Sequence, residues 1–487
     1  MSRPADPLVL GVDSSTQSTK VELRRVDDGA VVASGRATHP STTPPVSEQD
    51  PRAWWSALVE AVGSLGDHRA DVVALAVAGQ QHGLVLADES GEPLRPAPLW
   101  NDTTAAAAAA ALVASIGPEA WASGCGSVPL AAFTIAKLAY LREVEPDVVA
   151  RTERVFLPHD HLTWRLTGAH VTDRGDASGT GWFDPSADAY RPDLLEHAGV
   201  PADEWIDRLP EVRGPTDPAG SLTAEAAEAL GLPAGIPVGP GTGDNMAAAL
   251  GLGLEAGDVV ISLGTSGTVY SVSATPTADP SGVVAGFADA SGRHLPLVCT
   301  LNATKVTDAV ARWLGTDAVG LADLALAAGP APIDPVVVPW FDGERTPNRP
   351  DARGSLHGLR PDTSPEELAR AAHDGVLCGL LDGVDALRRA GVTVDGRVLL
   401  IGGGARSEAY RRRAADLTGG AVLVPDADEV VATGAAVQAA AVHLGVPVDS
   451  MAGRWGLGAG RTVEPDPDAE PQATRRRYTR VIDGLGP

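Results

Sequence analysis

Two segments of the chain share one pattern of apolar and polar positions, although about 250 residues separate them. The first has the apolar run Leu8–Val12, the polar turn Asp13-Ser-Ser-Thr16 and the alternating stretch Lys20–Arg24. The second has Ile261–Leu263, then Gly-Thr-Ser-Gly, then Thr268–Val272. Each pattern predicts a strand, a tight turn and a second strand. Such turns present backbone N–H groups and hydroxyls to an anion such as phosphate, so we expect two related phosphate-binding hairpins in a duplicated domain.

Apolar runs of strand length alternate with patterns of helical period over the rest of the chain, and this alternation predicts an α/β fold. Strands are expected over 8–37, as a meander, and over 72–78, 258–263 and 398–401. Helices are expected over 51–65, 105–111, 130–143, 159–167 and 364–390.

Three further segments carry expectations about how the chain is organised. The alanine run 105–111 has high helix propensity and is expected to pack closely against a neighbour. The Pro/Gly-rich stretches 210–220 and 231–243 are the strongest boundary signals. Residues 461–475, rich in Pro, Glu and Asp, are expected to be a linker to a C-terminal helix.

Composition narrows the class of protein. With 487 residues, 44% hydrophobic and 21% charged, the chain is long enough for two or three globular domains. A net charge of -25 disfavours binding to nucleic acid or to an anionic membrane. Three widely spaced cysteines argue against a disulfide framework, and the polar N-terminus with no apolar run near 18 residues predicts neither signal peptide nor membrane span. A cytoplasmic protein is expected.

A single carboxylate stands among glycines shortly before the second hairpin, in Gly243-Asp244-Asn245. A carboxylate beside a phosphate-binding turn is what phosphoryl transfer to a hydroxyl requires, because it can orient the hydroxyl and accept its proton. Asp244 is expected to lie in a mobile glycine-rich turn, and the alternative is that it only forms an Asx turn between Gly243 and Asn245.

The common nucleotide-binding motifs do not account for these turns. No Gly-Lys-Ser/Thr exists, so the Walker A class is excluded, and the protein-kinase motifs are absent. Gly402-Gly403-Gly404 lies between a predicted strand and a helix, but Ser407 stands where a dinucleotide fingerprint needs its third glycine. A turn of this kind lets backbone approach a flat ring or a phosphate closely, and it also occurs as a plain turn.

Several segments, in this order and spacing, together resemble one family. They are Gly11-Val-Asp13-Ser-Ser-Thr16 with Lys20, Ser47-Glu-Gln-Asp-Pro51, Ala78-Gly-Gln-Gln-His-Gly83, Leu99-Trp-Asn-Asp102, Asp176-Ala-Ser-Gly-Thr180, Gly243-Asp-Asn245, Ser262-Leu-Gly-Thr-Ser-Gly267, Gly343-Glu-Arg-Thr-Pro347 and Ile401-Gly-Gly-Gly-Ala-Arg-Ser407. The chain from Leu8 to about Leu444 resembles the FGGY carbohydrate kinases of the actin/hexokinase-like superfamily, and most closely the branch that phosphorylates D-xylulose.

The resemblance implies two actin/hexokinase-like (ribonuclease H-like) α/β domains with a cleft between them. Residues 1–246 would be the sugar-binding domain and residues 247–487 the ATP-binding domain. It further implies transfer of a phosphoryl group from Mg-ATP to D-xylulose, and family members are often homodimers.

The resemblance also assigns roles to individual residues. Asp244 matches the general base, and Asp13 matches the carboxylate that acts at the phosphates through Mg²⁺. The sugar would be held by Gln81, His82, Trp100, Asn101, Asp102, Asp244 and Asn245, and ATP by Thr16, Lys20, Gly264, Thr265, Ser266, Gly403 and Gly404. Gln81 departs from the family, where Met is common. His159 stands where Lys is frequent, and Asp342 where Ser is frequent.

Alternatives stay open at this point. The chain could be another sugar or polyol kinase of the family, such as a ribulokinase, gluconokinase or glycerol kinase. It could also be a non-catalytic ATP-binding sugar sensor, although a sensor has no need of Asp244 as a base. His82 could be a structural histidine. The His159-Asp160-His161 cluster suggests a metal site, but without a further ligand nearby in sequence a structural role is favoured.

Overall fold

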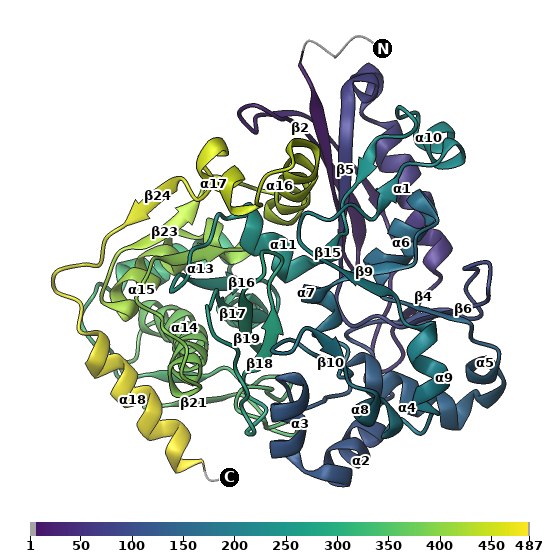
Figure 1. Ribbon diagram of the computed structural model, residues 1–487. Coiled ribbons are helices and arrows are strands. Elements are labelled where there is room, and N and C mark those ends of the chain that lie inside the picture. Colours follow the sequence, from purple (N-terminus) through teal and green to yellow (C-terminus); the bar gives the residue numbers. More distant parts are fainter. Residues whose placement is uncertain (1–5, 486–487) are drawn as a thin grey trace. The chain divides into compact units, whose positions relative to one another are not determined.

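The computed structural model describes residues 6–485 (Figure 1). The chain forms two compact units, each assembled from segments that are not contiguous in sequence. The first unit comprises the chain up to Leu254 together with Ala274–Leu295 and Ala427–Gly458. The second comprises Glu255–Ser273, Pro296–Asp426 and the chain from Ala459. Each unit contains a mixed sheet of parallel and antiparallel strands together with helices, so the predicted α/β class is confirmed.

The first sheet has the strand order β13-β14-β5-β1-β2-β3, and β15 also pairs with β5. The predicted meander over residues 8–37 is confirmed, since β1, β2 and β3 are antiparallel neighbours. β1, β14 and β15 run parallel to β5. The strands are β1 (Leu8–Ser14), β2 (Ser18–Arg25), β3 (Val31–Thr38), β5 (Val72–Gly79), β13 (Gly220–Ser221), β14 (Pro237–Val238) and β15 (Thr242–Gly243).

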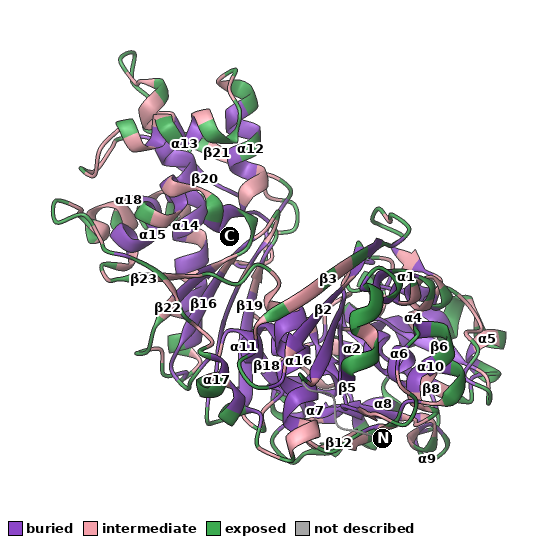
Figure 2. Cartoon of the chain, turned by 90° about the horizontal axis from the view of Figure 1, so that it is seen from above, coloured by how far each residue is buried: buried purple, intermediate pink, exposed green. Residues whose placement is uncertain are grey.

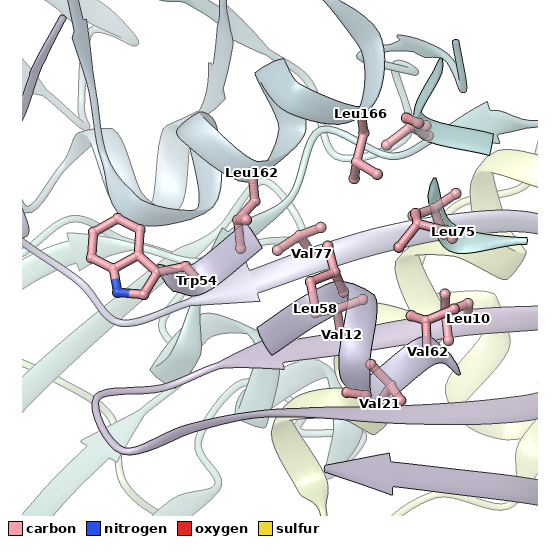
Figure 3. Packing of buried hydrophobic residues seen from close by; sticks show 14 of the residues in the cluster. Leu10, Val12, Val21, Trp54, Leu58, Val62, Leu75, Val77, Leu162 and Leu166 are labelled. Atoms are coloured by element: carbon pink, nitrogen blue, oxygen red, sulfur yellow. The ribbon is translucent and has the colours of Figure 1, made fainter. Parts of the chain in front are cut away.

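One face of this sheet is covered by α1 (Pro51–Gly63), α6 (Pro158–Thr167) and α10 (Ala224–Leu230). Figure 3 shows Leu10 and Val12 of β1 packed there with Leu58 of α1 and Leu162 of α6. Successive side chains of a strand point to opposite faces. Because Val12 belongs to this apolar core, Asp13 must point to the other face.

The other face of the sheet is covered by α16 (Val430–Leu444), which also packs against α11 (Asp244–Gly251). Backbones approach very closely here. A Cβ atom on Gly11 would lie 2.0 Å from the carbonyl oxygen of Ala432, and one on Gly434 would lie 1.8 Å from that of Ala247. No side chain larger than hydrogen fits at Gly11 or Gly434, so these glycines hold α11 and α16 close to the strand that carries Asp13.

The remaining elements of the first unit are short. The predicted helix at the alanine run exists as α2, but only Ala109 and Leu112 are buried in it, so the expected close packing is wrong over most of its surface (Figure 2). The Pro/Gly-rich stretches contribute β12, β13, β14 and β15 to this unit, which continues to Leu254. The helices are α2 (Ala106–Ile116), α3 (Pro118–Cys125), α4 (Thr134–Val144), α5 (Pro146–Ala150), α7 (Arg174–Ala177), α8 (Pro192–Glu196), α9 (Ala202–Trp205) and α17 (Asp449–Trp455). The strands are β4 (Glu48–Gln49), β6 (Val85–Ala87), β7 (Ala97–Pro98), β8 (Arg154–Phe156), β9 (Val171–Asp173), β10 (Phe183–Asp184), β11 (Ala189–Tyr190), β12 (Glu211–Arg213) and β18 (Ala285–Ala288).

The sheet of the second unit includes the order β19-β17-β16-β22-β23-β24. β16 and β17 form the predicted second hairpin, and β22 runs parallel to β16. The predicted linker over 461–475 is wrong at both ends, because β24 pairs with β23 in its first part and α18 begins at Pro471. Only residues 464–470 connect the two elements. The strands are β16 (Val259–Leu263), β17 (Gly267–Ser271), β19 (His294–Thr300), β20 (Val336–Val338), β21 (Ser355–His357), β22 (Val398–Ile401), β23 (Val422–Pro425) and β24 (Gly460–Val463). The helices are α12 (Thr304–Trp313), α13 (Ala318–Ala327), α14 (Pro365–Arg389), α15 (Glu408–Thr418) and α18 (Pro471–Gly484).

No single helix within residues 6–485 has the length and apolar character needed to cross a membrane. Only α16 and α17 taken together reach them, and they are bent by 107°.

Candidate active site

The first unit brings the ends of three neighbouring strands together. β1 and β15 both run parallel to β5, with Ser14 and Gly243 each paired to Gly79 at its end. Asp13 therefore lies at the carboxyl end of β1, Gln81 follows that of β5, and Asp244 follows that of β15. Ligands of open α/β sheets bind at the carboxyl ends of the strands. Most of the sugar-binding and catalytic residues predicted from sequence are thus gathered at one edge of one sheet.

Asp244 is the first residue of α11, so the expectation of a mobile glycine turn is wrong. Its side chain is partly exposed, and its Oδ1 atom accepts hydrogen bonds from the backbone N–H of Asn245 at 2.8 Å and from Asn245 Nδ2 at 2.9 Å. Within residues 6–485, Oδ2 has no hydrogen-bond partner. Burial and the charge of Asp13 raise the pKa of Asp244 to about 7. One oxygen is fixed by the protein, which leaves the other to accept a proton.

Asp13 is 2% exposed and lies among charged neighbours. It accepts a hydrogen bond from Ser15 Oγ, and Lys20 Nζ lies 3.7 Å from Asp13 Oδ2 and 2.6 Å from Glu429 Oε2. Burial raises the pKa of Asp13 to about 6, although Ser15 and Lys20 oppose this rise. Burial deprives the carboxylate of hydration, and a buried carboxylate with a raised pKa is typical of a functional site.

The loop Trp100–Asp102 lies against the first hairpin. Trp100 is 41% exposed, and its Nε1 donates to Thr16 Oγ1 at 2.8 Å. Asn101 Oδ1 is buried and has no hydrogen-bond partner within residues 6–485. Asp102 is buried and accepts from the backbone N–H groups of Ser47 and Thr104, at 2.7 and 2.9 Å. Asp102 therefore holds the loop in shape, while the Trp100 ring remains exposed to a ligand.

Thr16 and Lys20 of the predicted nucleotide residues lie in the first hairpin, in the first unit. The second unit gathers the others at the carboxyl ends of β16 and β22, which are parallel neighbours. The carbonyl groups of Gly264 and Thr265 accept from the first N–H groups of the α12 region, each at 3.0 Å. Gly402 has a φ of +86°, and a Cβ there would lie 2.7 Å from the carbonyl oxygen of Leu263. A Cβ on Gly403 would meet no atom within 4 Å, so its backbone is open to a flat ligand.

Comparison with known proteins identifies the family. The model of the N-terminal domain of the FGGY family of carbohydrate kinases matches residues 8–251, and that of the C-terminal domain matches residues 259–443. The chain belongs to the FGGY family of carbohydrate kinases. The family predicted from the sequence motifs is therefore confirmed.

Two relatives and one crystal structure that are at least 40% identical to this chain are xylulose kinases. A xylulose kinase of Streptomyces coelicolor is 46% identical over 490 residues, covering 100% of this chain and 98% of the relative. One of Streptomyces rubiginosus is 48% identical over 466 residues, covering 95% and 94%. The crystal structure of xylulose kinase from Bifidobacterium adolescentis is 40% identical, with a TM-score of 0.84 and coverage of 98% and 99%. A gluconate kinase from Lactobacillus acidophilus reaches a TM-score of 0.90 at 22% identity, with coverage of 99% and 98%, so the fold alone does not separate the sugars.

His159 of this FGGY kinase lies in a buried cluster of charges behind the strand ends. Its Nε2 atom is 3.1 Å from Asp160, 3.5 Å from Asp173 and 3.3 Å from Asp176. Burial disfavours the charged imidazole, but these carboxylates outweigh burial and raise the pKa of His159 to about 9. His161 instead packs between aromatic rings, and burial lowers its pKa to about 4. The two histidines therefore occupy separate environments and do not face a common ligand.

Lys137 was not identified from the sequence. It lies on α4 and contacts the backbone of His82. Lys137 is fully buried, and its Nζ donates to the backbone carbonyls of His82, at 2.8 Å, and Ala132. His82 has a φ of +66°, which is rare for a residue with a side chain. Its Nδ1 lies 2.8 Å from the Gly179 carbonyl oxygen, and its ring stacks on Phe133. The only sequence signal was that this chain has so few lysines.

We expect Lys137→Met to raise the KM for the sugar about tenfold or more while the KM for ATP stays within about twofold, because loss of a buried ammonium–carbonyl contact costs roughly 1–3 kcal/mol. Steady-state kinetics with each substrate varied in turn measures the split. Arg142→Met removes an exposed cation from the same helix and should change neither constant. Equal effects of Lys137→Met on both substrates would contradict a role in shaping the sugar site.

Proposed function

We propose that this chain transfers the γ-phosphoryl group of ATP to the C5 hydroxyl of D-xylulose, giving D-xylulose 5-phosphate and ADP. The observation that carries the proposal is the environment of Asp244, a partly buried carboxylate with one fixed oxygen, one free oxygen and a pKa of about 7, beside Asp13. The near-full-length xylulose kinase relatives support D-xylulose as the acceptor.

In the proposed reaction Asp244 orients the sugar hydroxyl and accepts its proton. An alcohol is a weak acid, so the proton leaves late, as the bond to phosphorus forms. A base with a pKa near the working pH combines a large deprotonated fraction with adequate basicity. Asn245 holds Asp244 Oδ1 and also donates to Gln81 Oε1 at 2.9 Å, which fixes the carboxylate plane relative to the sugar side of the site.

Asp13 has the chemistry to help hold Mg²⁺. Magnesium takes oxygen ligands and is usually bound by one or two carboxylates together with substrate phosphates. Asp13 is a buried carboxylate at the strand edge, and within residues 6–485 no group of three or more His, Cys, Asp or Glu side chains could hold a metal by itself. These observations fit a Mg²⁺ that arrives with the nucleotide, whose charge it would neutralise. Lys20 adds a second positive charge, kept in place by Glu429.

The second unit offers the proposed ATP contacts. The turn Gly264–Ser266 presents N–H groups and hydroxyls suited to phosphate, and the open backbone at Gly403 suits the adenosine part. Because Gly402 and Gly404 pack against Leu263, the two turns are held side by side. The domain assignment proposed from sequence, sugar on residues 1–246 and ATP on 247–487, rests on this division of the motifs.

A sugar panel tests the acceptor. The Gln81 amide, held by Asn245, replaces an apolar contact common in the family and should favour a hydroxyl or carbonyl of the acceptor. We expect the highest kcat/KM for D-xylulose among D-xylulose, ribulose, gluconate and glycerol when ADP release is measured by a coupled assay. A higher kcat/KM for another acceptor would indicate that the chain belongs to another branch of the FGGY family. ATP binding without turnover on any of them would favour the sensor reading.

Domain closure is expected because the proposed sugar residues belong to the first unit, whereas the proposed adenosine turn and the second phosphate turn belong to the second unit. The reaction must bring the two substrates together and exclude water, which resembles the acceptor hydroxyl. Small-angle scattering should show a smaller radius of gyration with D-xylulose and a nonhydrolysable ATP analogue than without ligands. ATP hydrolysis without sugar should be slow. An unchanged radius combined with rapid sugar-independent hydrolysis would contradict closure.

A cytoplasmic homodimer remains our expectation for the assembled enzyme. Cys125 and Cys378 are buried free thiols, which suits a reducing compartment. Sedimentation equilibrium of the purified chain measures the oligomeric state directly.

A further inference from the structure

The second unit contains a cavity of about 780 Å³ that none of the predicted catalytic, sugar-binding or nucleotide-binding residues lines. Val259, Ile261 and Val398, from β16 and β22, form its apolar floor, in which Val259 and Ile261 are themselves buried. Leu381 and Val384 of α14 extend this surface, and α18, which packs against α14, supplies polar side chains (Figure 1). Ligand pockets of small molecules typically have about 300–1,000 Å³, so this cavity is large enough for a metabolite.

The cavity lies toward the opposite ends of the strands from the nucleotide turns. Val259 and Val398 are the first residues of β16 and β22, which run parallel and in register, whereas the turns containing Gly264 and Gly403 follow their last residues. Strands of four or five residues are roughly 13–17 Å long at about 3.3 Å per residue. A molecule in the cavity would therefore not compete with ATP for its turns.

Arginines give the cavity a positive side in a chain whose net charge is -25. Arg388 and Arg475 line it but are engaged with aspartates: Arg388 Nη1 lies 2.9 Å from Asp385 Oδ1, and Arg475 Nη2 lies 2.8 Å from Asp385 Oδ2. Their charge is largely neutralised locally. These two arginines therefore form part of the cavity wall and add little net positive charge for binding an anion.

Arg476 and Arg480 differ from these two. They lie one turn apart on α18, so both project from the same side of the helix. Both line the cavity, and within residues 6–485 neither forms an ion pair. Asp483 is a second carboxylate in the lining, besides Asp385, and neither lies within ion-pair distance of Arg476 or Arg480.

We propose that this cavity binds a small anion with an apolar body, its headgroup at Arg476 and Arg480 and its body on the strands β16 and β22. Guanidinium groups bind phosphate and carboxylate through paired N–H donors, and two of them in succession suit a phosphate monoester or a carboxylate. The cavity combines this polar side with an apolar floor, and the floor favours such a ligand over a bare inorganic ion. Bound there, it would lie outside the reaction centre.

The test uses anilinonaphthalene sulfonate, an aromatic sulfonate whose fluorescence rises on binding. It is titrated into the full chain in the presence of a saturating nonhydrolysable ATP analogue. We expect one saturable site, weakened about tenfold or more in Arg476→Glu/Arg480→Glu. The control Arg151→Glu/Arg312→Glu changes the net charge equally at exposed arginines away from the cavity and should bind as the unaltered chain does. Kinase turnover and melting temperature should be unchanged in both, and Arg476→Gln/Arg480→Gln carries the test if the charge reversal fails to fold.

Competition identifies the headgroup. Phenyl phosphate and phenylacetate offer the same apolar ring with a phosphate or a carboxylate, and the one that displaces the dye at lower concentration names the preferred anion. The proposal is overturned if the reversed and unaltered chains bind the dye equally, or if neither compound displaces it. The proposal is also overturned if inorganic phosphate displaces the dye as effectively as phenyl phosphate does. These readouts do not depend on turnover, so they stand apart from the assay for D-xylulose.

Discussion

Asp244→Asn should lower kcat for D-xylulose phosphorylation by about 10²–10⁴-fold while ATP still binds, because a positioned base contributes a factor of that size. The amide keeps the shape of the side chain and its contact with Asn245 but cannot accept a proton. Nucleotide affinity measured by titration should stay within about twofold, since within residues 6–485 the Asp244 carboxylate is hydrogen-bonded to Asn245 and to none of the proposed nucleotide residues. A variant retaining more than about a tenth of the turnover would remove Asp244 from the role of base.

The pH dependence of the unaltered enzyme gives a second, independent measurement of this role. The raised pKa of about 7 means that Asp244 is protonated, and unable to act, below that pH. The value of kcat/KM for the sugar should therefore rise as pH increases through about 7 and level off above it. Residual activity of Asp244→Asn should not show that rise.

Asp13→Asn should reduce kcat about 10²-fold or more and raise the Mg²⁺ concentration needed for half-maximal activity, because charge neutralisation at the phosphates is a large part of phosphoryl transfer. The change leaves the sugar contacts at Gln81 and Asn245 intact, so D-xylulose affinity should be nearly unchanged. Titration of Mg²⁺ at fixed ATP measures the effect. Wild-type turnover with an unchanged Mg²⁺ requirement would contradict this assignment.

Measurements of thermal stability test whether the carboxylates of Asp13 and Asp244 have a functional or a structural role. The folded-state pKa values of Asp13 and Asp244 are raised, so their ionised forms are less favourable in the folded chain than in the unfolded chain. This destabilisation is absent at acid pH and grows as pH rises above the unfolded value near 4. At pH 8 the neutral Asn variants should therefore melt at the same temperature or higher, even though activity is lost. A structural carboxylate would lose stability together with activity.

The sequence was sufficient for the features that depend on local pattern. Alternation of apolar residues located β1 and β2, and the isolated carboxylate between Gly243 and Asn245 located the proposed base. Parallel pairing with β5 then brought Asp13 and Asp244 to one edge, a consequence of strand order that a single sequence does not contain. The short strand β24 was missed because it has only four residues, of which Val463 is the one large apolar residue, and its pairing with β23 is made by backbone groups.

Long-range partners account for the other omissions. Lys137 sits in an apolar helix, and its acceptor, the His82 carbonyl, is 55 residues away. Glu429, which holds Lys20, is 409 residues away from it. Neither pair leaves a periodic signal, because only the folded backbone brings the groups within hydrogen-bond distance. Asp102 was expected in the sugar site from its motif, whereas its oxygens are engaged by Ser47 and Thr104 of the surrounding loops.

The position of α16 affects how this chain can be made. The helix that covers Gly11 and Asp13 is encoded by residues 430–444, so the ribosome releases the first strand of the sheet long before its covering layer exists. At about 5–20 residues per second, synthesis from Leu254 to Ala427 takes roughly 9–35 s. During that time the face of β1 that carries Gly11 and Asp13 is uncovered. The nascent chain then depends on other protection against association with other chains. The N-terminal half is thus a late-completing domain, even though it is the first to be synthesised.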